Sequence, residues 1–114
     1  MAATPKKRAS VAVDHVVVTE EEYIPTKTIR KTTPYISNYE YASLVLARML
    51  QLSAPNGRPM ISKKDITLYD PMVIATREIN MRLPPLVIRR HLPDGSVEDW
   101  LLTDEENPLI FPRS

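Results

Sequence analysis

A run of apolar residues with helical spacing follows Ser37. Ser37 and Glu40 have the S-x-x-E spacing of a capping box, in which each side chain accepts a hydrogen bond from the backbone N–H of the other residue. A proline–asparagine–glycine segment at 55–57 is typical of a helix end. The pattern therefore predicts a helix that begins after Ile36 and extends to Leu52.

The predicted helix carries an unusually broad apolar stripe. Its members are Tyr39, Ala42, Val45, Leu46, Met49, Leu50 and Leu52, and Tyr41 and Leu44 widen it. We expect a helix this apolar, in a domain this small, to have two covered faces, one of them against another protein. The alternative is a helix that packs only within the protein's own core.

A second helix is predicted from Asp70-Pro71, because aspartate is a good N-cap and proline is tolerated at the first helical position. Glu78 and Arg82 have the i, i+4 spacing of a favourable ion pair, and Pro84-Pro85 ends the helix. We expect its inner stripe to be ordinary core, formed by Met72, Ala75, Ile79 and Leu83.

Two β-like runs, Leu86 to Leu92 and Val97 to Leu102, enclose the turn sequence Pro93-Asp94-Gly95. Proline presets φ, aspartate bonds to nearby backbone, and glycine tolerates positive φ, so the pattern predicts a β-hairpin. Together with the two helices, this hairpin predicts a small α+β domain.

The first part of the chain is predicted to be a flexible tail at 1–31, followed by the domain at 32–114, which includes an extended C-terminal end. Prolines interrupt the segment, and Glu20-Glu21-Glu22 makes it locally acidic. Val11 to Val18 is largely β-branched, which favours an edge strand once a partner supplies the neighbouring strand.

Composition excludes several kinds of site. The chain has 114 residues, a formal charge of +1, no cysteine and only two histidines, so we expect no disulfide, thiolate zinc site, multi-histidine metal site or cofactor. Its two glycines cannot build a glycine-rich phosphate loop. The longest uncharged stretch, Met49 to Gly57, is far short of the ~20 apolar residues of a membrane span, and no signal peptide is visible.

Catalytic equipment is also sparse. Glu98 and Asp99 are adjacent on a predicted strand, so their side chains point to opposite faces and form no carboxylate pair. His91 alone is a poor candidate for a general base. We therefore predict no catalytic residues, and a small enzyme is the least favoured class.

Arg89 and Arg90 are the most distinctive charges of the hairpin, and they too point to opposite faces. One is expected to pair with Asp99 or Glu98 across the hairpin, which leaves the other for an acidic protein surface. Phosphate contact by these arginines is a less favoured alternative. For Lys6-Lys7-Arg8 a solvated terminus is the favoured interpretation, and a nuclear-localisation or nucleic-acid-binding patch is the alternative. The residues by themselves favour an interaction module.

Several motifs together resemble the omega-like small subunit of DNA-directed RNA polymerases, which is the eukaryotic common sixth subunit, archaeal subunit K and their viral homologues. The resemblance spans about Thr32 to Thr103. It rests on Thr32-Thr33-Pro34-Tyr35, Tyr39-Glu40, Arg48, Leu50-Gln51, Asp70-Pro71, Ile74-Ala75, Glu78, the stretch from Pro85 to Ser96, and Glu98-Asp99-Trp100.

This resemblance implies a non-catalytic subunit that packs on the largest polymerase subunit, promotes assembly, and meets DNA only through the complex, without membrane or small-molecule partners. It implies these partner-binding residues: Tyr35, Tyr39, Glu40, Arg89, Arg90, Leu92, Pro93, Asp94, Gly95 and Trp100. The implied location is the nucleus for a cellular protein, or a cytoplasmic viral transcription site or the virion for a viral one. The alternative is a free-standing nucleic-acid- or protein-binding module.

Overall fold

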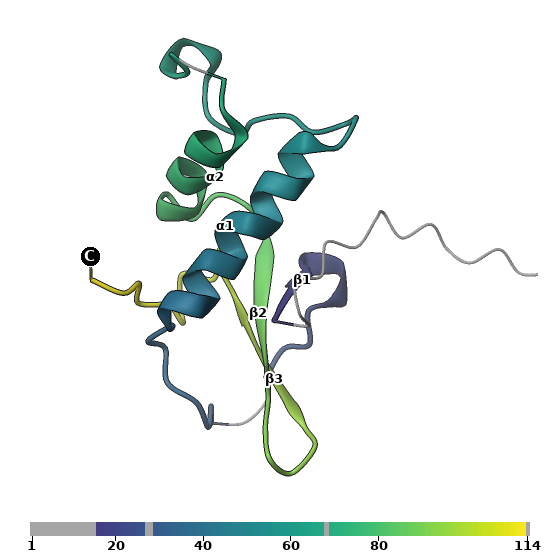
Figure 1. The fold of residues 1–114 in the computed structure, drawn as a ribbon. Helices are drawn as coiled ribbons and strands as arrows, with labels where there is room; N and C mark the ends of the chain where they lie inside the picture. The colour runs from purple at the N-terminus through teal and green to yellow at the C-terminus, as the bar shows by residue number, and fades with distance from the viewer. Residues whose placement is uncertain (1–15, 27–28, 68, 114) are drawn as a thin grey trace, which may run out of the picture.

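One α-helix packs on a three-stranded antiparallel sheet, and a second α-helix packs mainly against the first, in the computed structural model, which describes residues 16–26, 29–67 and 69–113 (Figure 1). The helices are α1 (Asn38–Ser53) and α2 (Pro71–Asn80). The strands are β1 (Val17–Thr19), β2 (Leu86–His91) and β3 (Val97–Leu101), in the order β1-β2-β3. The predicted α+β class is confirmed.

The predicted hairpin is β2 and β3, with Ile88 opposite Trp100 and His91 opposite Val97. Gly95 takes the positive φ of +89° that the turn requires, which explains why glycine stands there. The Asp94 carboxylate accepts a hydrogen bond of 2.9 Å from the Ser96 N–H. The turn therefore uses the local chemistry that its sequence indicated.

The third strand comes from the segment predicted to be a tail. β1 pairs with β2, Val17 lies opposite Ile88, and the Val17 side chain is fully buried. The neighbour that we expected a partner protein to supply is this chain's own hairpin. Residues 1–15, including most of Val11 to Val18, lie outside the described residues.

Helix α1 begins as predicted. The Ser37 side chain accepts from the Glu40 N–H at 3.0 Å, and Glu40 accepts from the Ser37 N–H at 2.9 Å, which completes the capping box.

The predicted apolar stripe of α1 is only partly its inner face. The helix buries Ser43, Leu44, Ala47, Arg48 and Leu52, whereas Tyr39, Leu46 and Leu50 are exposed. Two polar residues can be buried because each has partners: Ser43 donates to the Tyr39 carbonyl, and Arg48 meets the buried Glu78. Leu50 is 48% exposed, so its truncation would leave no core cavity.

Helix α2 buries Ile74, Ala75, Glu78 and Ile79, so half of its predicted stripe is core; Leu83 packs partly buried beside it, and Met72 is exposed. The predicted Glu78–Arg82 pair is wrong. The helix ends at Asn80, and Arg82 follows with a φ of +58°.

The end of α2 is a Schellman motif, in which the Arg82 N–H donates to the Ile79 carbonyl and the Leu83 N–H to the Glu78 carbonyl. The left-handed position of this motif usually holds glycine. In this chain Arg82 occupies that position, and its guanidinium lies 4.2 Å from the centroid of the Phe111 ring.

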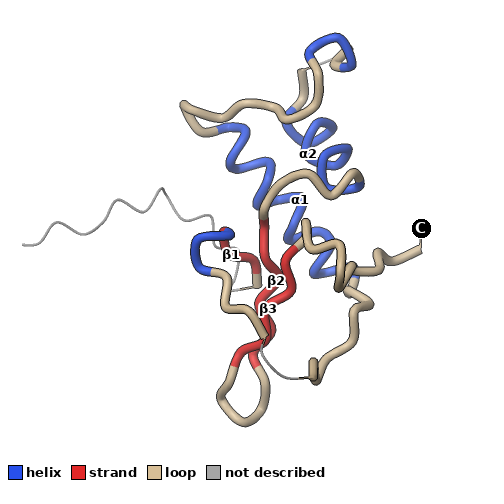
Figure 2. Tube along the Cα trace, turned by 180° about the vertical axis from the view of Figure 1, so that it is seen from behind, coloured by secondary structure: helices blue, strands red, loops and turns tan. Residues whose placement is uncertain are grey.

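The C-terminal segment closes the structure against the start of α1 (Figure 2). Tyr35 and Ile110 form a parallel bridge, and Leu109 is buried in the core between α1 and the sheet. Phe111 meets Tyr41 edge to face, with 5.5 Å between the ring centroids. The segment is therefore part of the fold.

Candidate partner interface

Arg90 connects strand β2 to the start of helix α1. Its Nε donates to the Glu40 carboxylate at 2.9 Å and one Nη donates to the same carboxylate at 3.1 Å, a bidentate ion pair. The guanidinium also donates to the Thr32 hydroxyl at 2.8 Å and to the backbone carbonyls of Thr33 and Tyr35. The Arg90 side chain thus holds in place the segment that leads into α1.

Glu40 has two tasks in this arrangement, because it closes the capping box and accepts from Arg90. Burial raises the pKa of Glu40, but the hydrogen bonds from Arg90 and the Ser37 N–H outweigh that effect, so its pKa lies below the usual 4.5. A carboxylate held in its charged form is suited to orient Arg90.

Trp100, on β3, is buried and 3% exposed. Its indole N–H lies 3.0 Å from the Thr32 hydroxyl and 3.2 Å from the Glu98 carboxylate. The Arg30 guanidinium lies 4.1 Å from the centroid of the Trp100 ring, a cation–π contact. Trp100 therefore anchors the segment before α1 to the sheet.

Glu98 accepts hydrogen bonds from the N–H groups of Lys31 and Thr32, and from the Thr32 hydroxyl. Burial raises the pKa of Glu98, but these bonds and the Trp100 N–H together lower it to about 2. Thr32 and Glu98 were not among the predicted site residues, although both belong to the motifs that carry the resemblance.

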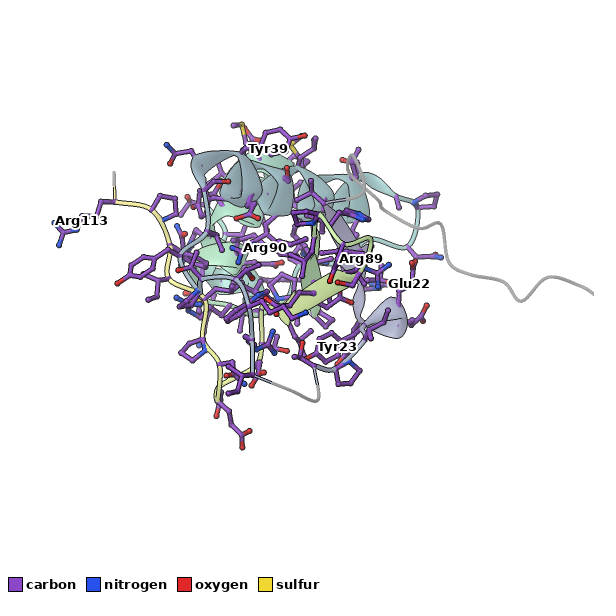
Figure 3. All side chains as sticks on the ribbon, turned by 90° about the horizontal axis from the view of Figure 1, so that it is seen from below. Glu22, Tyr23, Tyr39, Arg89, Arg90 and Arg113 are labelled. Carbon is purple, nitrogen blue, oxygen red and sulfur yellow. The ribbon has the colours of Figure 1, made fainter. Side chains whose placement is uncertain are left out.

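Arg89 faces the other side of the sheet. It forms a bidentate pair with Asp99, with both N–O distances at 2.9 Å, and donates to the Glu22 carbonyl at 2.7 Å. Figure 3 shows Arg89 beside Glu22, with Arg90 apart from them. The Asp99 hydrogen bond raises the pKa of Arg89, although burial opposes the shift.

The opposite orientation of the two arginines is confirmed, and so is the pairing of one of them across the hairpin, which joins Arg89 to Asp99. The expectation that the second arginine has no partner in the chain is wrong, because Arg90 is paired with Glu40. The sequence shows Glu40 and Arg90 only as two separate charges, because they lie 50 positions apart on different elements.

The predicted site residues separate into two groups. Glu40, Arg89, Arg90 and Trp100 are engaged in the interior contacts described above. The others reach the surface to different degrees: Leu92 is half-buried, and Tyr35, Tyr39, Pro93, Asp94 and Gly95 are exposed. The exposed residues lie at two places, the start of α1 and the hairpin tip.

The hairpin tip is polar and locally ordered. Hydrogen bonds from Ser96 lower the pKa of Asp94, and Asp94 lies 3.8 Å from the Lys31 ammonium group. Pro93 and Gly95 add little apolar area beside it, so the tip is suited to polar contacts.

The outer face of α1 is the larger apolar surface. Tyr39, Leu46 and Leu50 are 55%, 40% and 48% exposed. Their spacing of seven and four residues puts them on one side of the helix. This outer α1 stripe (Tyr39, Leu46 and Leu50) adds to the predicted site two leucines that the sequence pattern had placed in one broad apolar stripe, without saying which side of the helix faces the core.

No group of three or more His, Cys, Asp or Glu side chains that could hold a metal ion occurs in the described part of the chain. None of the helices described is long and apolar enough to cross a lipid bilayer.

Similarity to known proteins identifies the chain's relatives. It is 46% identical over 81 residues to the RPABC2 subunit of DNA-directed RNA polymerases I, II, and III of Saccharomyces cerevisiae, across 71% of this chain and 50% of that protein. The corresponding subunit of Schizosaccharomyces pombe is 41% identical, across 68% of this chain and 53% of the relative. Subunit 6B of DNA-directed RNA polymerases II and V of Arabidopsis thaliana is 36% identical, across 83% and 65%.

No protein-family model matches the chain. The chain spans about half the length of the two yeast relatives. The similarity nevertheless covers most of the chain itself, at identities that establish homology. The chain therefore belongs to the RPABC2-like family of omega-like small subunits that its motifs resemble.

Proposed function

We propose that this chain is a non-catalytic subunit of a multisubunit DNA-directed RNA polymerase, where it packs on the largest subunit and promotes assembly and stability of the enzyme. The observation that carries the proposal is the identity of 36–46% to polymerase subunits across most of the chain. The partner-binding residues are those implied by the resemblance, with the buried ones acting as internal supports.

The arrangement of charges supports a structural role. Arg89 and Arg90 are each held in a bidentate ion pair with an acidic residue of the same chain. Guanidinium groups that are held in ion pairs within the chain stabilise its surface and are not positioned to transfer protons or bind a substrate.

We propose the outer α1 stripe, with the exposed Tyr35 beside the helix start, as the surface that meets the large subunit. Contiguous exposed apolar side chains mark interaction sites on soluble proteins. The bonds from Arg90 to Glu40 and to the Tyr35 carbonyl fix this surface before binding, which lowers the entropy cost of association.

Co-purification from the native source tests both parts. A tagged chain should bring down the large polymerase subunits, and a Leu46→Asp, Leu50→Asp variant should recover at least about tenfold less of them, because it puts two charges into a buried apolar contact. Met72→Asp is the matched control, since Met72 is an exposed apolar residue on the other helix.

The outcomes separate the two claims. If the unmodified chain recovers no polymerase subunit, the proposed function fails. If it recovers them and the double variant does so equally well, the function stands and the α1 interface is wrong.

Location follows from the same proposal. We propose that the chain reaches DNA only as part of the polymerase, in the nucleus for a cellular protein, or at a cytoplasmic viral transcription site or in the virion for a viral one. Fluorescence microscopy of the tagged chain with a tagged large subunit should show the two together. Separate locations would contradict the proposal.

A further inference from the structure

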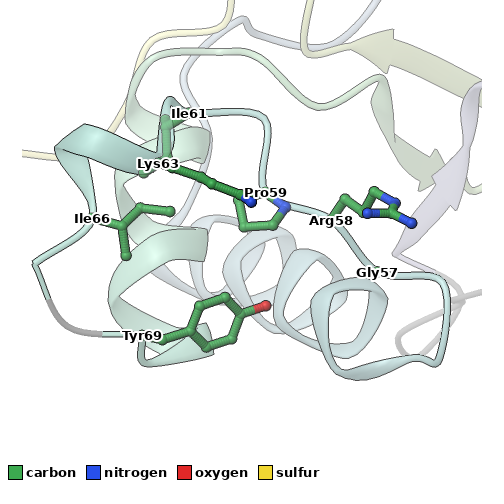
Figure 4. A pocket seen from close by; sticks show the side chains of 7 residues that line it. All are labelled: Gly57, Arg58, Pro59, Ile61, Lys63, Ile66 and Tyr69. Carbon is green, nitrogen blue, oxygen red and sulfur yellow. The ribbon is translucent and has the colours of Figure 1, made fainter.

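A groove of about 470 Å³ lies in the connection between α1 and α2 (Figure 4). Pro59, Ile61 and Ile66 give it an apolar lining. The exposed ring of Tyr69 lies at one side, and Arg58 and Lys63 bring positive charge to it. All of the lining residues belong to the connection between the two helices, and neither Arg90 nor any residue of the hairpin is among them.

The groove is held in shape by the interior of the domain. The Arg48 guanidinium donates to the Arg58 carbonyl at 2.9 Å, and Glu78 accepts from the Met60 and Ile61 N–H groups. At the other end, Arg77 donates to the Asp65 carbonyl at 2.8 Å. A connection that is bonded to both helices offers a preformed surface to a ligand.

The charge of the groove stands out against the rest of the described chain. The side chains of Arg30, Lys31, Arg48, Arg77, Arg82, Arg89 and Arg90 all contact groups of the same chain. The groove residues Arg58 and Lys63, and the neighbouring Lys64, have no acidic partner within the described residues. Arg113 also has no acidic partner within the described residues, but it lies apart at the C-terminal end (Figure 3), so the cluster of unpaired positive charge is the one at the groove.

We propose that the groove binds an acidic peptide segment of another protein, which places one apolar side chain against Pro59, Ile61 and Ile66 and flanking carboxylates near Arg58 and Lys63. The Tyr69 ring covers the side of the inserted side chain. The occupant is inferred from charge complementarity with an apolar floor, so the proposal does not depend on membership of a polymerase.

A nucleic acid fits these features less well. A strand-binding surface needs a longer basic track and several aromatic platforms for the bases. The groove offers a single aromatic ring and an aliphatic floor, and the whole chain has a formal charge of only +1. A peptide uses both the charge and the aliphatic floor.

Fluorescence anisotropy with the full chain tests the proposal. The probe is a short fluorescein-labelled peptide in which glutamates flank a central Leu-Phe pair, and the control probe has glutamine in place of glutamate. An Arg58→Glu, Lys63→Glu variant should bind the acidic probe at least about tenfold more weakly, because like charges then face each other. Arg113→Glu is the matched control, since Arg113 is an exposed cation outside the groove. Ile66→Ser should also weaken binding, because it removes part of the floor.

The proposal is supported if the wild type and Arg113→Glu bind the acidic probe, if the groove variants bind it more weakly, and if the glutamine probe does not bind. Absence of binding to the wild type overturns it, as does equal binding by the Arg58→Glu, Lys63→Glu variant. Tighter binding of a single-stranded oligothymidine than of the acidic probe also overturns it. Thermal unfolding of each variant establishes that it is folded, and because no polymerase is present, failure here leaves the proposed function untouched.

Discussion

Arg48 of α1 and Glu78 of α2 form an ion pair that is almost completely withdrawn from solvent. The Nε–Oε1 distance is 2.5 Å, and the two side chains are 9% and 0% exposed. Glu78 also accepts from two backbone N–H groups of the connection, and Arg48 also donates to Gln51 and to the Arg58 carbonyl. The pair thus joins both helices and the loop between them.

Replacing Arg48 with methionine should lower the free energy of unfolding by about 3–5 kcal/mol, because the Glu78 charge would stay buried without its partner. Denaturant unfolding measures the effect. Arg58→Met is the control, since its side chain is exposed and should change stability by less than about 0.5 kcal/mol. Equal midpoints for the two variants would show that the pair does not stabilise the fold.

Deletion of residues 1–31 should abolish the cooperative thermal transition, because it removes β1, with the buried Val17, and the Lys31 N–H that donates to the Glu98 carboxylate. Deletion of 1–15 should leave the transition intact, since every described contact is kept. We therefore propose that the folded domain begins near Val16. Circular dichroism during heating compares the two truncations, and a normal transition in the longer deletion would return the boundary to Thr32.

Acid should weaken the fold through Glu98. Its pKa is lowered from 4.5 to about 2 in the folded chain, so its contribution is complete above about pH 4.5 and is lost as the pH falls toward 2. That contribution is about 3 kcal/mol. Denaturant unfolding across this pH range should show a shallower loss of stability for Glu98→Gln than for the wild type, while Glu105→Gln, which changes an exposed carboxylate, should follow the wild type. Parallel curves for all three proteins would refute the assignment.

Arg90→Ala should destabilise the isolated chain by about 2–4 kcal/mol, because Glu40 loses its bidentate partner and three oxygen acceptors before α1 lose a donor. Arg90→Lys should recover only part of this loss, because an ammonium group cannot reproduce the planar fork of donors. Denaturant unfolding distinguishes this prediction from a purely intermolecular role. If Arg90→Ala were as stable as the wild type and only its co-purification failed, Arg90 would act on the partner alone.

The positive φ of Arg82 should carry a backbone strain that two substitutions at this position can measure. Both Arg82→Ala and Arg82→Gly remove the contact with Phe111, but only glycine adopts a φ of +58° without a steric cost. The glycine variant should therefore be more stable than the alanine variant by about 1 kcal/mol, measured from their thermal or denaturant midpoints. Equal stabilities would mean that the positive φ costs little at this position.

The parts of the fold that could be predicted from the sequence are those that nearest neighbours determine. The capping box needs Ser37 and Glu40, three residues apart, and the hairpin turn needs Asp94, Gly95 and Ser96. Each of these motifs satisfies its own backbone groups, so its short sequence is sufficient.

The inner face of α1 could not be predicted in the same way. Arg48 is polar by itself and becomes an interior residue only because Glu78 lies 30 positions further along the chain. Once Arg48 faces inward, Leu46 and Leu50 turn outward, since residues on a helix rotate together. The same limit applies to the candidate interface, where Arg90 and Glu40 are separated by 50 positions.

The pairing of β1 with β2 has a consequence for synthesis on the ribosome. The two helices and the hairpin are formed from neighbouring segments, but β1 emerges long before its neighbour, and the Ile24–Asp99 hydrogen bond beside it joins residues 75 positions apart. Contacts of such long range slow folding, because the chain loses the conformational entropy of closing a large loop before these contacts stabilise it. The Val17 side chain, which is buried in the folded chain, therefore stays exposed to solvent until β3 has been synthesised. During that interval the exposed apolar segment of the nascent chain is most accessible to a chaperone.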